Sequence, residues 1–255
     1  MCALAEMITL DGFPLTGTTR DGEWKRLGEL EGWFDSPDPK RANAPRDRGD
    51  GNYRTEINYE SRLITFNGRV ESKNHEYLHQ AASIVTALPG RGQKQFIVDG
   101  HGPTQWATVD PRGKVAVTFP TDTRMEFQIP LEAIDPFKYG EWRKFAASVG
   151  SDVAVFHRGN DDAVPYVVVS GSMPGGYTLS HAGSSVVVTE PLISGSPHTI
   201  DYRKRRLYKG GAPVRGGLST ASYAVVKSGQ RDTFSITPGT TGTATATMTL
   251  YDTYI

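Results

Sequence analysis

Apolar and polar residues alternate along most of the chain, and a period of two is typical of half-buried β-strands. The clearest example is RMEFQIPLEAI, residues 124–134, whose apolar side chains from Met125 to Leu131 share one face. Pro130 predicts an edge strand or a bulge within this run, because proline has no N–H to donate. The same alternation predicts strands at residues 95–99, 104–109, 113–119, 152–157, 163–170, 176–180, 184–189, 197–202, 221–227, 231–236 and 243–254.

The stretch NYRTEINYESRLITFNGRVES, residues 52–72, predicts two strands joined by a turn. Asn67-Gly68 lies between its alternating halves, and this dipeptide favours the tight turns of β-hairpins. We therefore expect a hairpin that reverses direction at Asn67-Gly68.

Only residues 73–88 show a clear helical period. Apolar residues recur at i, i+3, i+4 and i+7 from Leu78, which is the spacing of one helix face. Ser72 or Asn74 can cap the start of this helix, and Pro89-Gly90 ends it. One helix among so many strands predicts a mostly-β (α+β minor) fold.

The segment AIDPFKYGEW, residues 133–142, marks the predicted domain boundary. Asp135-Pro136 favours an extended or turn conformation, because the residue before a proline avoids the helical region. We therefore expect a first domain at residues 1–137 and a second at residues 138–255. The second has short strands separated by glycine and proline, which is typical of a β-sandwich.

Residues 35–52 form a long polar stretch with three prolines and charges of both signs. A loop of this length in a compact domain is usually functional or disordered. We consider two interpretations, an arm that packs on another chain and a solvated loop. Arg48-Gly49-Asp50 matches an integrin-type tripeptide, but three letters in a charged loop carry almost no information.

DYRKRRLY, residues 201–208, is a basic run flanked by tyrosines. On a single strand, alternation would place its four consecutive basic residues on both faces, two on each. This division disfavours a nucleic-acid surface and favours a solvated strand or salt bridges between subunits.

The composition indicates a soluble globular protein of 255 residues, 37% hydrophobic and 22% charged. Lys plus Arg number 28, as do Asp plus Glu, so the net charge is zero. A neutral chain has no long-range attraction to nucleic acid or to an anionic membrane. Cys2 is the only cysteine, which excludes an intrachain disulfide and a multi-cysteine metal site within one chain.

No stretch of the sequence approaches the roughly 20 apolar residues that span a bilayer. The segment MCALAEMITLDGF at the start has no basic residue and carries Glu6 in its short apolar part. We therefore expect no signal peptide, synthesis in a cytoplasm and no export by the ordinary route.

His75, Glu76 and His79 fit H-E-x-x-H, the signature of zinc proteases. In those enzymes two histidines on one helical face and a third protein ligand hold zinc, and the glutamate acts as general base. The predicted caps place His75 in the first turn, and the next carboxylates, Asp99 and Glu126, lie in strand-like sequence.

We therefore prefer an amphipathic helix that carries His75, Glu76 and His79 near its solvent-exposed edge. A zinc hydrolase is the less favoured alternative, and we expect metal analysis to find no stoichiometric zinc. No catalytic, cofactor-binding or metal-binding residues and no cofactor are assigned.

A β-sandwich at the C-terminal end raises the alternative of sugar binding. Sugar-binding platforms use exposed aromatic side chains, tryptophan above all, because a flat apolar face covers the C–H groups of the sugar ring. No tryptophan follows Trp142. The tyrosines that could serve instead are Tyr166, Tyr177, Tyr202, Tyr208, Tyr223, Tyr251 and Tyr254.

Several stretches, taken in order, resemble a known family. They are GELEGWFDSPDPKRANAPRDRGDGNY at 28–53, RLITFNGRVESKNHEYLHQAASIVTAL at 62–88, MEFQIPLEAIDPFKYG at 125–140, PHTIDYRKRRLY at 197–208 and TFSITPGTTGTATATMTLYDTYI at 233–255. As an ordered pattern they resemble the distal tail proteins (minor tail proteins) of long-tailed, siphovirus-type bacteriophages.

The resemblance implies an N-terminal tail-tube-like β-barrel domain with one flanking helix, and a C-terminal β-sandwich that is galectin-like or carbohydrate-module-like. It also implies a homohexameric ring in the virion, at the tail tip, between the tail tube protein and the tail tip or baseplate hub protein. The tape measure protein is a further implied partner, a membrane is not, and DNA only passes through the lumen. The family implies a structural protein and not an enzyme, and zero net charge fits a conduit better than a DNA binder.

Overall fold

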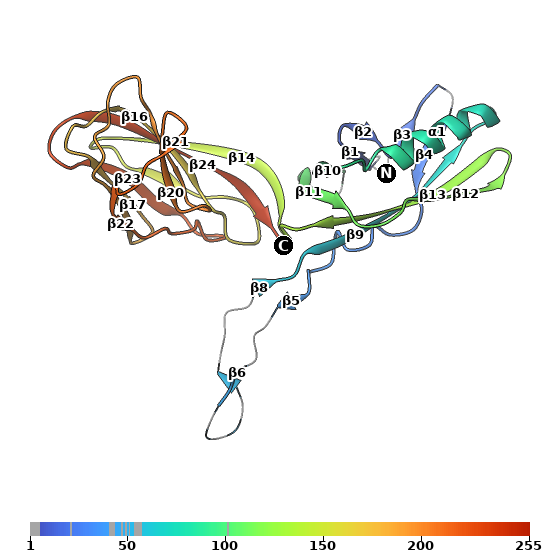
Figure 1. Cartoon of the computed structure of the whole chain (residues 1–255), viewed down its shortest axis with the longest axis horizontal. Helices are drawn as coiled ribbons and strands as arrows, with labels where there is room; N and C mark the ends of the chain where they lie inside the picture. Colours follow the sequence, from blue (N-terminus) through green and yellow to red (C-terminus); the bar gives the residue numbers. More distant parts are fainter. Residues whose placement is uncertain are drawn as a thin grey trace. The chain divides into compact units, whose positions relative to one another are not determined.

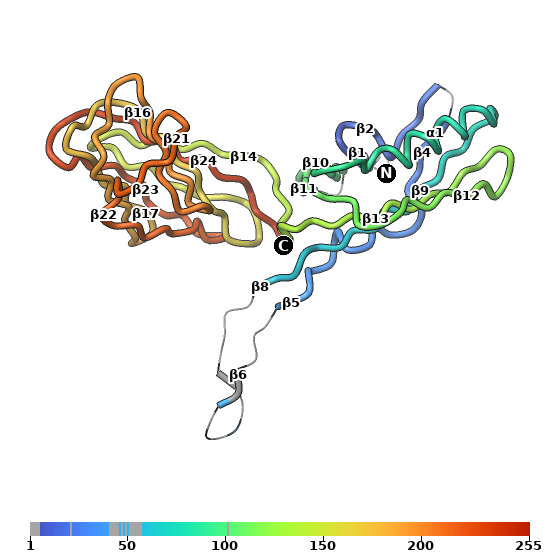
Figure 2. Tube along the Cα trace, viewed as in Figure 1, coloured from blue at the N-terminus to red at the C-terminus, as the bar shows by residue number. Residues whose placement is uncertain are grey.

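The computed structural model describes residues 6–20, 22–40, 44–46, 48, 50, 52–53, 58–100 and 102–255. By its internal contacts the chain divides into two compact units, Met1–Lys138 with Ile255, and Tyr139–Tyr254 (Figure 2). The described residues form 24 strands and one helix, so the predicted mostly-β class is confirmed. That residues 1–137 and 138–255 are separate functional domains stays a prediction. The described part of the chain contains no helix long and apolar enough to cross a membrane.

The first unit combines two ten-residue strands, β9 and β13, with shorter strands and the helix (Figure 1). Its elements are β1 (Met7–Leu10), β2 (Phe13–Pro14), β3 (Gly17–Thr18), β4 (Glu23–Arg26), β5 (Pro39–Lys40), β6 (Ala44–Pro45), β7 (Asn52–Tyr53), β8 (Asn58–Tyr59), β9 (Arg62–Glu71), α1 (His75–Ala87), β10 (Lys94–Asp99), β11 (Gln105–Pro111), β12 (Ala116–Thr121) and β13 (Arg124–Ala133).

An antiparallel ladder connects most of these strands in the order β3-β4-β9-β13-β11-β10-β1-β2, and β12 also pairs with β13. Among the described residues no pairing joins β2 to β3, so the expected barrel is not closed. The chain between these two strands bonds to β1 instead. Leu15 N donates to Ile8 O at 2.7 Å, and Ile8 N donates to the Thr16 hydroxyl at 2.9 Å.

Strand β9 runs straight through Asn67-Gly68, so the predicted hairpin at this dipeptide is wrong. All ten residues from Arg62 to Glu71 pair with β13. A Cβ on Gly68 would lie 2.3 Å from the Phe127 ring, which shows that the glycine makes room for an aromatic side chain. Packing therefore explains this glycine better than turn chemistry does.

Helix α1 confirms the predicted helix, with bounds that differ by one or two residues. Asn74 is the N-cap, since its side-chain oxygen accepts from Tyr77 N at 3.4 Å, and Ser72 Oγ accepts from Asn74 N at 3.0 Å. Leu78, Ala81 and Val85 are buried. The helix lies against β9, β12 and β13 (Figure 1).

Pro130 was predicted to mark an edge strand or a bulge. Strand β13 has partners on both sides and pairs with β9 in an unbroken register through Pro130, so it is not an edge strand and has no bulge against β9. The alternation itself is confirmed, because Met125, Phe127, Ile129 and Leu131 are all buried. On the side away from β9, β13 pairs first with β12 and then with β11. Pro130 lies at this change of partner, where its carbonyl accepts from Arg112 N at 3.2 Å.

The predicted loop at residues 35–52 contains short strands where the structure describes it. Strand β5 pairs with β8, and β6 pairs with β7. Gly49 of the Arg48-Gly49-Asp50 tripeptide lies outside the described residues.

The second unit is a β-sandwich of antiparallel strands, as expected. Its first sheet has the order β21-β20-β19-β16-β24-β14, and its second β15-β23-β17-β18-β22. Buried residues of both sheets, among them Val169, Leu179, Phe234 and Met248, form one core. The strands are β14 (Lys138–Ser148), β15 (Val153–Val155), β16 (Tyr166–Ser172), β17 (Tyr177–His181), β18 (Ser184–Val188), β19 (His198–Asp201), β20 (Arg206–Lys209), β21 (Ala212–Pro213), β22 (Leu218–Ala221), β23 (Asp232–Pro238) and β24 (Thr243–Tyr254).

Two predictions in this unit are wrong. The basic run at 201–208 is a hairpin and not a single strand, because β19 ends at Asp201 and β20 begins at Arg206. Arg205 turns the chain with φ of 52°. The strand predicted at 221–227 is mostly irregular, although Val226 forms an isolated bridge with Ala163.

Candidate functional site

The two histidines of the H-E-x-x-H motif lie side by side on the exposed side of α1. One helical turn separates His75 from His79, so their side chains share a face. The Nε2 atoms lie 3.0 Å apart and the ring centroids 4.7 Å apart. His75 is in the first turn, as expected, and both side chains are exposed.

The turn between β12 and β13 borders this pair. His75 Nδ1 lies 3.0 Å from the Asp122 carbonyl oxygen, and the Phe119 ring lies 4.9 Å from the His79 ring. No group of three or more His, Cys, Asp and Glu side chains within the described ranges is placed to hold a metal ion. The structure therefore brings His75 and His79 together but places no third side-chain ligand of a zinc protease beside them in that part of the chain.

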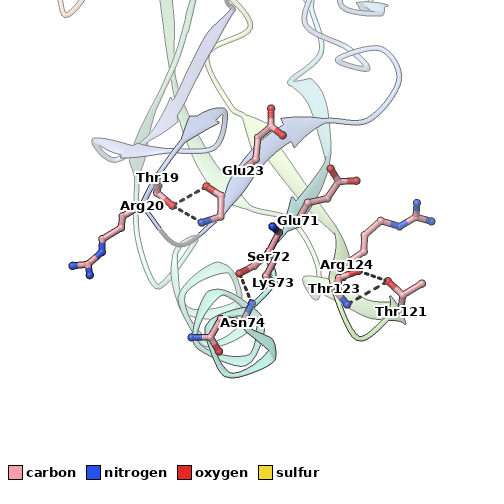
Figure 3. A pocket seen from close by; sticks show the side chains of 11 residues that line it. Thr19, Arg20, Glu23, Glu71, Ser72, Lys73, Asn74, Thr121, Thr123 and Arg124 are labelled. Carbon is pink, nitrogen blue, oxygen red and sulfur yellow. Dashed lines mark hydrogen bonds between the residues drawn. The ribbon is translucent and has the colours of Figure 1, made fainter.

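An open cleft of about 910 Å³ lies at the start of α1 (Figure 3). The β3–β4 turn, the end of β9 and the β12–β13 turn surround it. The lining residues are Thr19, Arg20, Gly22, Glu23, Glu71, Ser72, Lys73, Asn74, Thr121, Thr123 and Arg124.

Most polar groups of this cleft bond to one another or to nearby strands. Thr19 Oγ1 donates to Gly22 O at 2.8 Å, and Thr123 N donates to Thr121 Oγ1 at 3.4 Å (Figure 3). Lys25 forms ion pairs with Glu23 at 2.7 Å and with Glu71 at 3.7 Å. The cleft is thus an open gap between turns, and its lining carries charges of both signs.

A cluster of buried cations, which we call the Arg62–Lys138 cluster, fixes irregular segments of the first unit. Arg62 is 1% exposed and donates to the carbonyl oxygens of Gly32 at 2.8 Å, Asp35 at 2.6 Å and Pro136 at 2.9 Å. Lys138 is 5% exposed. Burial, and then the nearby charge of Arg62, lower the pKa of Lys138 to about 8.

Sequence reasoning missed the Arg62–Lys138 cluster. The two cations are far apart in the chain, and each stands at a strand end, where a polar residue is unremarkable. Their partners are main-chain carbonyl groups, which every amino acid has, so the identities of the partner residues do not reveal the contacts. No sequence signal could have found this cluster.

The first unit also presents open sheet edges within the described residues. Strand β12 pairs only with β13, and β3 pairs only with β4. Ala116 and Thr118 on β12 are exposed, and Phe119 is 40% exposed. An edge strand of this kind offers backbone groups to another chain.

In the second unit, aromatic side chains gather on the outer face of the first sheet. Tyr166 pairs with Thr249, two residues before Tyr251, whereas the neighbouring Val167 and Leu250 point into the core. Tyr166 is 45% and Tyr251 40% exposed.

The other aromatic residues considered for sugar binding divide between surface and core. Trp142 is 51% exposed. Tyr177 and Tyr202 are buried. Tyr208, Tyr223 and Tyr254 are half-buried.

No family model matches the chain, and no curated protein matches it. Solved structures do. The crystal structure of the SPP1 Dit (gp 19.1) protein, described as a paradigm of the hub adsorption apparatus in phages that infect Gram-positive bacteria, has a TM-score of 0.74 at 13% identity, over 98% of this chain and 99% of that chain.

The phage P2 baseplate in its activated conformation is also similar. The form with Ca gives a TM-score of 0.45 at 7% identity, over 96% of this chain and 97% of that chain. The form with Sr gives 0.42 at 8% identity, with the same coverage. At the TM-score found with SPP1 Dit, this chain has the fold of that tail hub protein over almost its whole length.

Proposed function

We propose that this chain is a structural protein of a bacteriophage tail, one subunit of a homohexameric ring at the distal end of a long tail. The observation that carries the proposal is the fold shared with SPP1 Dit over 98% of the chain. The ring would join the tail tube protein to the tail tip or baseplate hub protein, with the tape measure protein as a further partner. The chain would be made in the cytoplasm of the bacterial host and then reside in the virion.

The open edges of the first unit support this proposal. In the section β3-β4-β9-β13-β12 of the ladder, β12 and β3 are the outermost strands at opposite ends. If β12 of one copy pairs beside β3 of the next, the contact is head-to-tail, and such contacts form a ring when the rotation between copies closes on itself. Pairing also satisfies edge groups that would otherwise favour aggregation.

The charge balance supports a passive channel. The chain carries 28 basic and 28 acidic residues, so a ring of copies has no net charge to attract DNA. Affinity for DNA grows with the number of phosphates that a protein neutralises. A chain without net charge therefore favours a channel through which DNA passes over a channel that binds DNA.

Light scattering and negative-stain electron microscopy of the full chain test this proposal. We expect closed six-fold rings, alone or on addition of the tail tube protein. Antibody labelling of intact particles should place the chain at the far end of the tail. A chain that stays monomeric with its partners present, together with label elsewhere in the particle, would contradict the proposal.

A second candidate function is recognition of a cell-wall carbohydrate by the second unit. The exposed Trp142, Tyr166 and Tyr251 favour it, because exposed aromatic faces bind the apolar side of sugar rings. Arg203 donates to the Tyr139 hydroxyl at 2.6 Å, and the Tyr139 and Tyr251 rings lie 5.9 Å apart, so this face also holds ordered polar groups. A glycan array of the full chain beside its Trp142→Ala and Tyr166→Ala variants tests it. Binding by the parent alone supports the function, and silence on all glycans argues against it.

A further inference from the structure

The facing ring nitrogens of His75 and His79 have the separation that a shared metal ion requires. Metal–imidazole bonds are about 2.1 Å long, and two such bonds at a right angle place their nitrogens about 3.0 Å apart. The observed distance between the two Nε2 atoms is 3.0 Å. The rings are almost perpendicular, with 87° between their planes.

The contact with Asp122 fixes the tautomer that His75 needs to bind a metal ion. Its Nδ1 lies 3.0 Å from the Asp122 carbonyl oxygen, which can only accept, so Nδ1 carries the proton and donates it. In the neutral ring Nε2 then presents a lone pair toward His79. Histidine ligands of metals commonly donate their other N–H to a carbonyl in this way, which orients the ring.

The position of the proton on His79 differs between the state without a cation and the state with one. Without a cation, His79 Nε2–H donates to the lone pair of His75 Nε2. A cation between the rings needs a lone pair on both Nε2 atoms, so His79 carries its proton on Nδ1 instead. This is a change of tautomer, and the neutral pair takes up and releases no net proton.

The surroundings of the pair set it apart from the other histidines. Phe119 packs 4.9 Å from the His79 ring and 6.4 Å from the His75 ring, which limits their movement. The chain has six histidines. His157, His181 and His198 are at most 4% exposed, and His101 lies outside the described residues.

We propose that His75 and His79 bind a divalent transition-metal ion as a two-imidazole chelate, with water in the remaining positions. The right-angled geometry suits the square or octahedral coordination of Cu²⁺ or Ni²⁺ better than the tetrahedral coordination of Zn²⁺. Glu76 has no part in it, because the next residue on a helix points to a different face. The site is therefore not that of a zinc protease, and the inference does not depend on the proposed tail function.

Binding of the ion would clamp the first turn of α1. The chelate links residues one turn apart, so it forms only while that turn is helical, and an ion that binds only the folded state stabilises that state. Through the Asp122 carbonyl the same turn is attached to the β12–β13 hairpin. We therefore expect the ion to raise the melting temperature of the chain.

Calorimetric titration with Cu²⁺ and with Ni²⁺ tests the proposal on the full chain. A Cys2→Ser background removes the one thiol. We expect one equivalent to bind, with a nitrogen-ligand pattern in the Cu²⁺ electron paramagnetic resonance spectrum. His75→Gln and His79→Gln should each lower the affinity by more than about tenfold, because a direct ligand matters at least as much as an outer partner.

Two matched variants complete the test. Glu76→Gln and His101→Gln should both bind like the parent. Circular dichroism of each variant confirms that α1 is intact. Absence of one-equivalent binding in the parent, or affinity that survives both His75→Gln and His79→Gln, would overturn the proposal. Loss of binding in His101→Gln alone would place the site at His101 and would overturn the proposal as well.

Discussion

The ammonium group of Lys138 donates a 2.9 Å hydrogen bond to the carbonyl oxygen of Trp33, 105 positions earlier in the chain. The same group lies 5.7 Å from the centre of the Trp33 ring. The carbonyl also accepts from Arg62 at 3.3 Å, so one main-chain oxygen serves two buried cations. The proximity of two positive charges, away from water, has a measurable consequence for stability.

The free energy of unfolding of the first unit, which contains Lys138, should rise with pH between about 8 and 10.5, the pKa of Lys138 in the folded chain and its ordinary value. Over this interval the unfolded chain holds the proton and the folded chain does not, so stability increases with pH. A shift of this size corresponds to about 3 kcal/mol. Urea unfolding at a series of pH values measures it.

Lys138→Met should remove this rise, and Lys144→Met, at an exposed position of the same strand, should keep it. A parent chain whose stability is flat across the interval would show that Lys138 titrates normally.

Gly68→Ala should destabilise the first unit by about 1–3 kcal/mol, the usual cost of forcing extra volume into a packed core. The new Cβ would lie 2.3 Å from the Phe127 ring and 2.7 Å from the Phe66 ring. Gly113→Ala is the matched control, because its Cβ would lie an ordinary 3.4 Å from Pro130. Thermal unfolding of both variants decides the matter, and equal melting temperatures would refute the packing role of Gly68.

The second unit should lose stability as the pH falls below 6.5, the ordinary pKa of the buried His181. Burial lowers the pKa of this residue, although Asp232 opposes the effect, with its carboxylate 3.8 Å from Nε2. Below 6.5 the unfolded chain takes up the proton first, so acid favours unfolding. Burial also lowers the pKa values of His157 and His198, so these residues add to the loss of stability in acid.

Unfolding monitored at pH 7.5 and pH 5.5 checks this expectation. His181→Leu should reduce the loss of stability between the two values. A parent chain equally stable at both pH values would contradict the prediction.

Lysines on the open edge of β12 should prevent ring assembly. The double variant Ala116→Lys, Thr118→Lys places two charges on exposed positions of this strand, and edge lysines block pairing with another sheet. Ser219→Lys with Ala221→Lys is the control, on β22, an exposed edge strand of the second unit. Light scattering should find rings for the control and monomers for the β12 variant, and rings in both would exclude β12 from the interface.

Local patterns predicted the elements whose environment is uniform along their length. The alternation in β13 and the apolar stripe of α1 each reflect one buried face, so the spacing of apolar residues along the chain reveals them. The sequence predicted Asn74 as a possible helix cap, because capping depends only on the residues next to it.

Other features depend on contacts distant in sequence. The dipeptide Asn67-Gly68 favours a turn, but the pairing of ten consecutive residues of β9 with β13 outweighs this local preference. Arg205 adopts a positive φ without being glycine or asparagine, so nothing marked the hairpin after Asp201. The sequence placed His75 and His79 on one helical face, but only the fold shows the Asp122 carbonyl that orients His75.

The Arg62 guanidinium contacts main-chain oxygens of Gly32, Trp33, Asp35 and Pro136, and every amino acid supplies such an oxygen. The path of these segments thus depends on the Arg62 side chain and not on the side chains of the residues to which it donates. Neighbouring positions can drift through evolution while the backbone keeps its course, which is one way for an architecture to outlast recognisable ancestry.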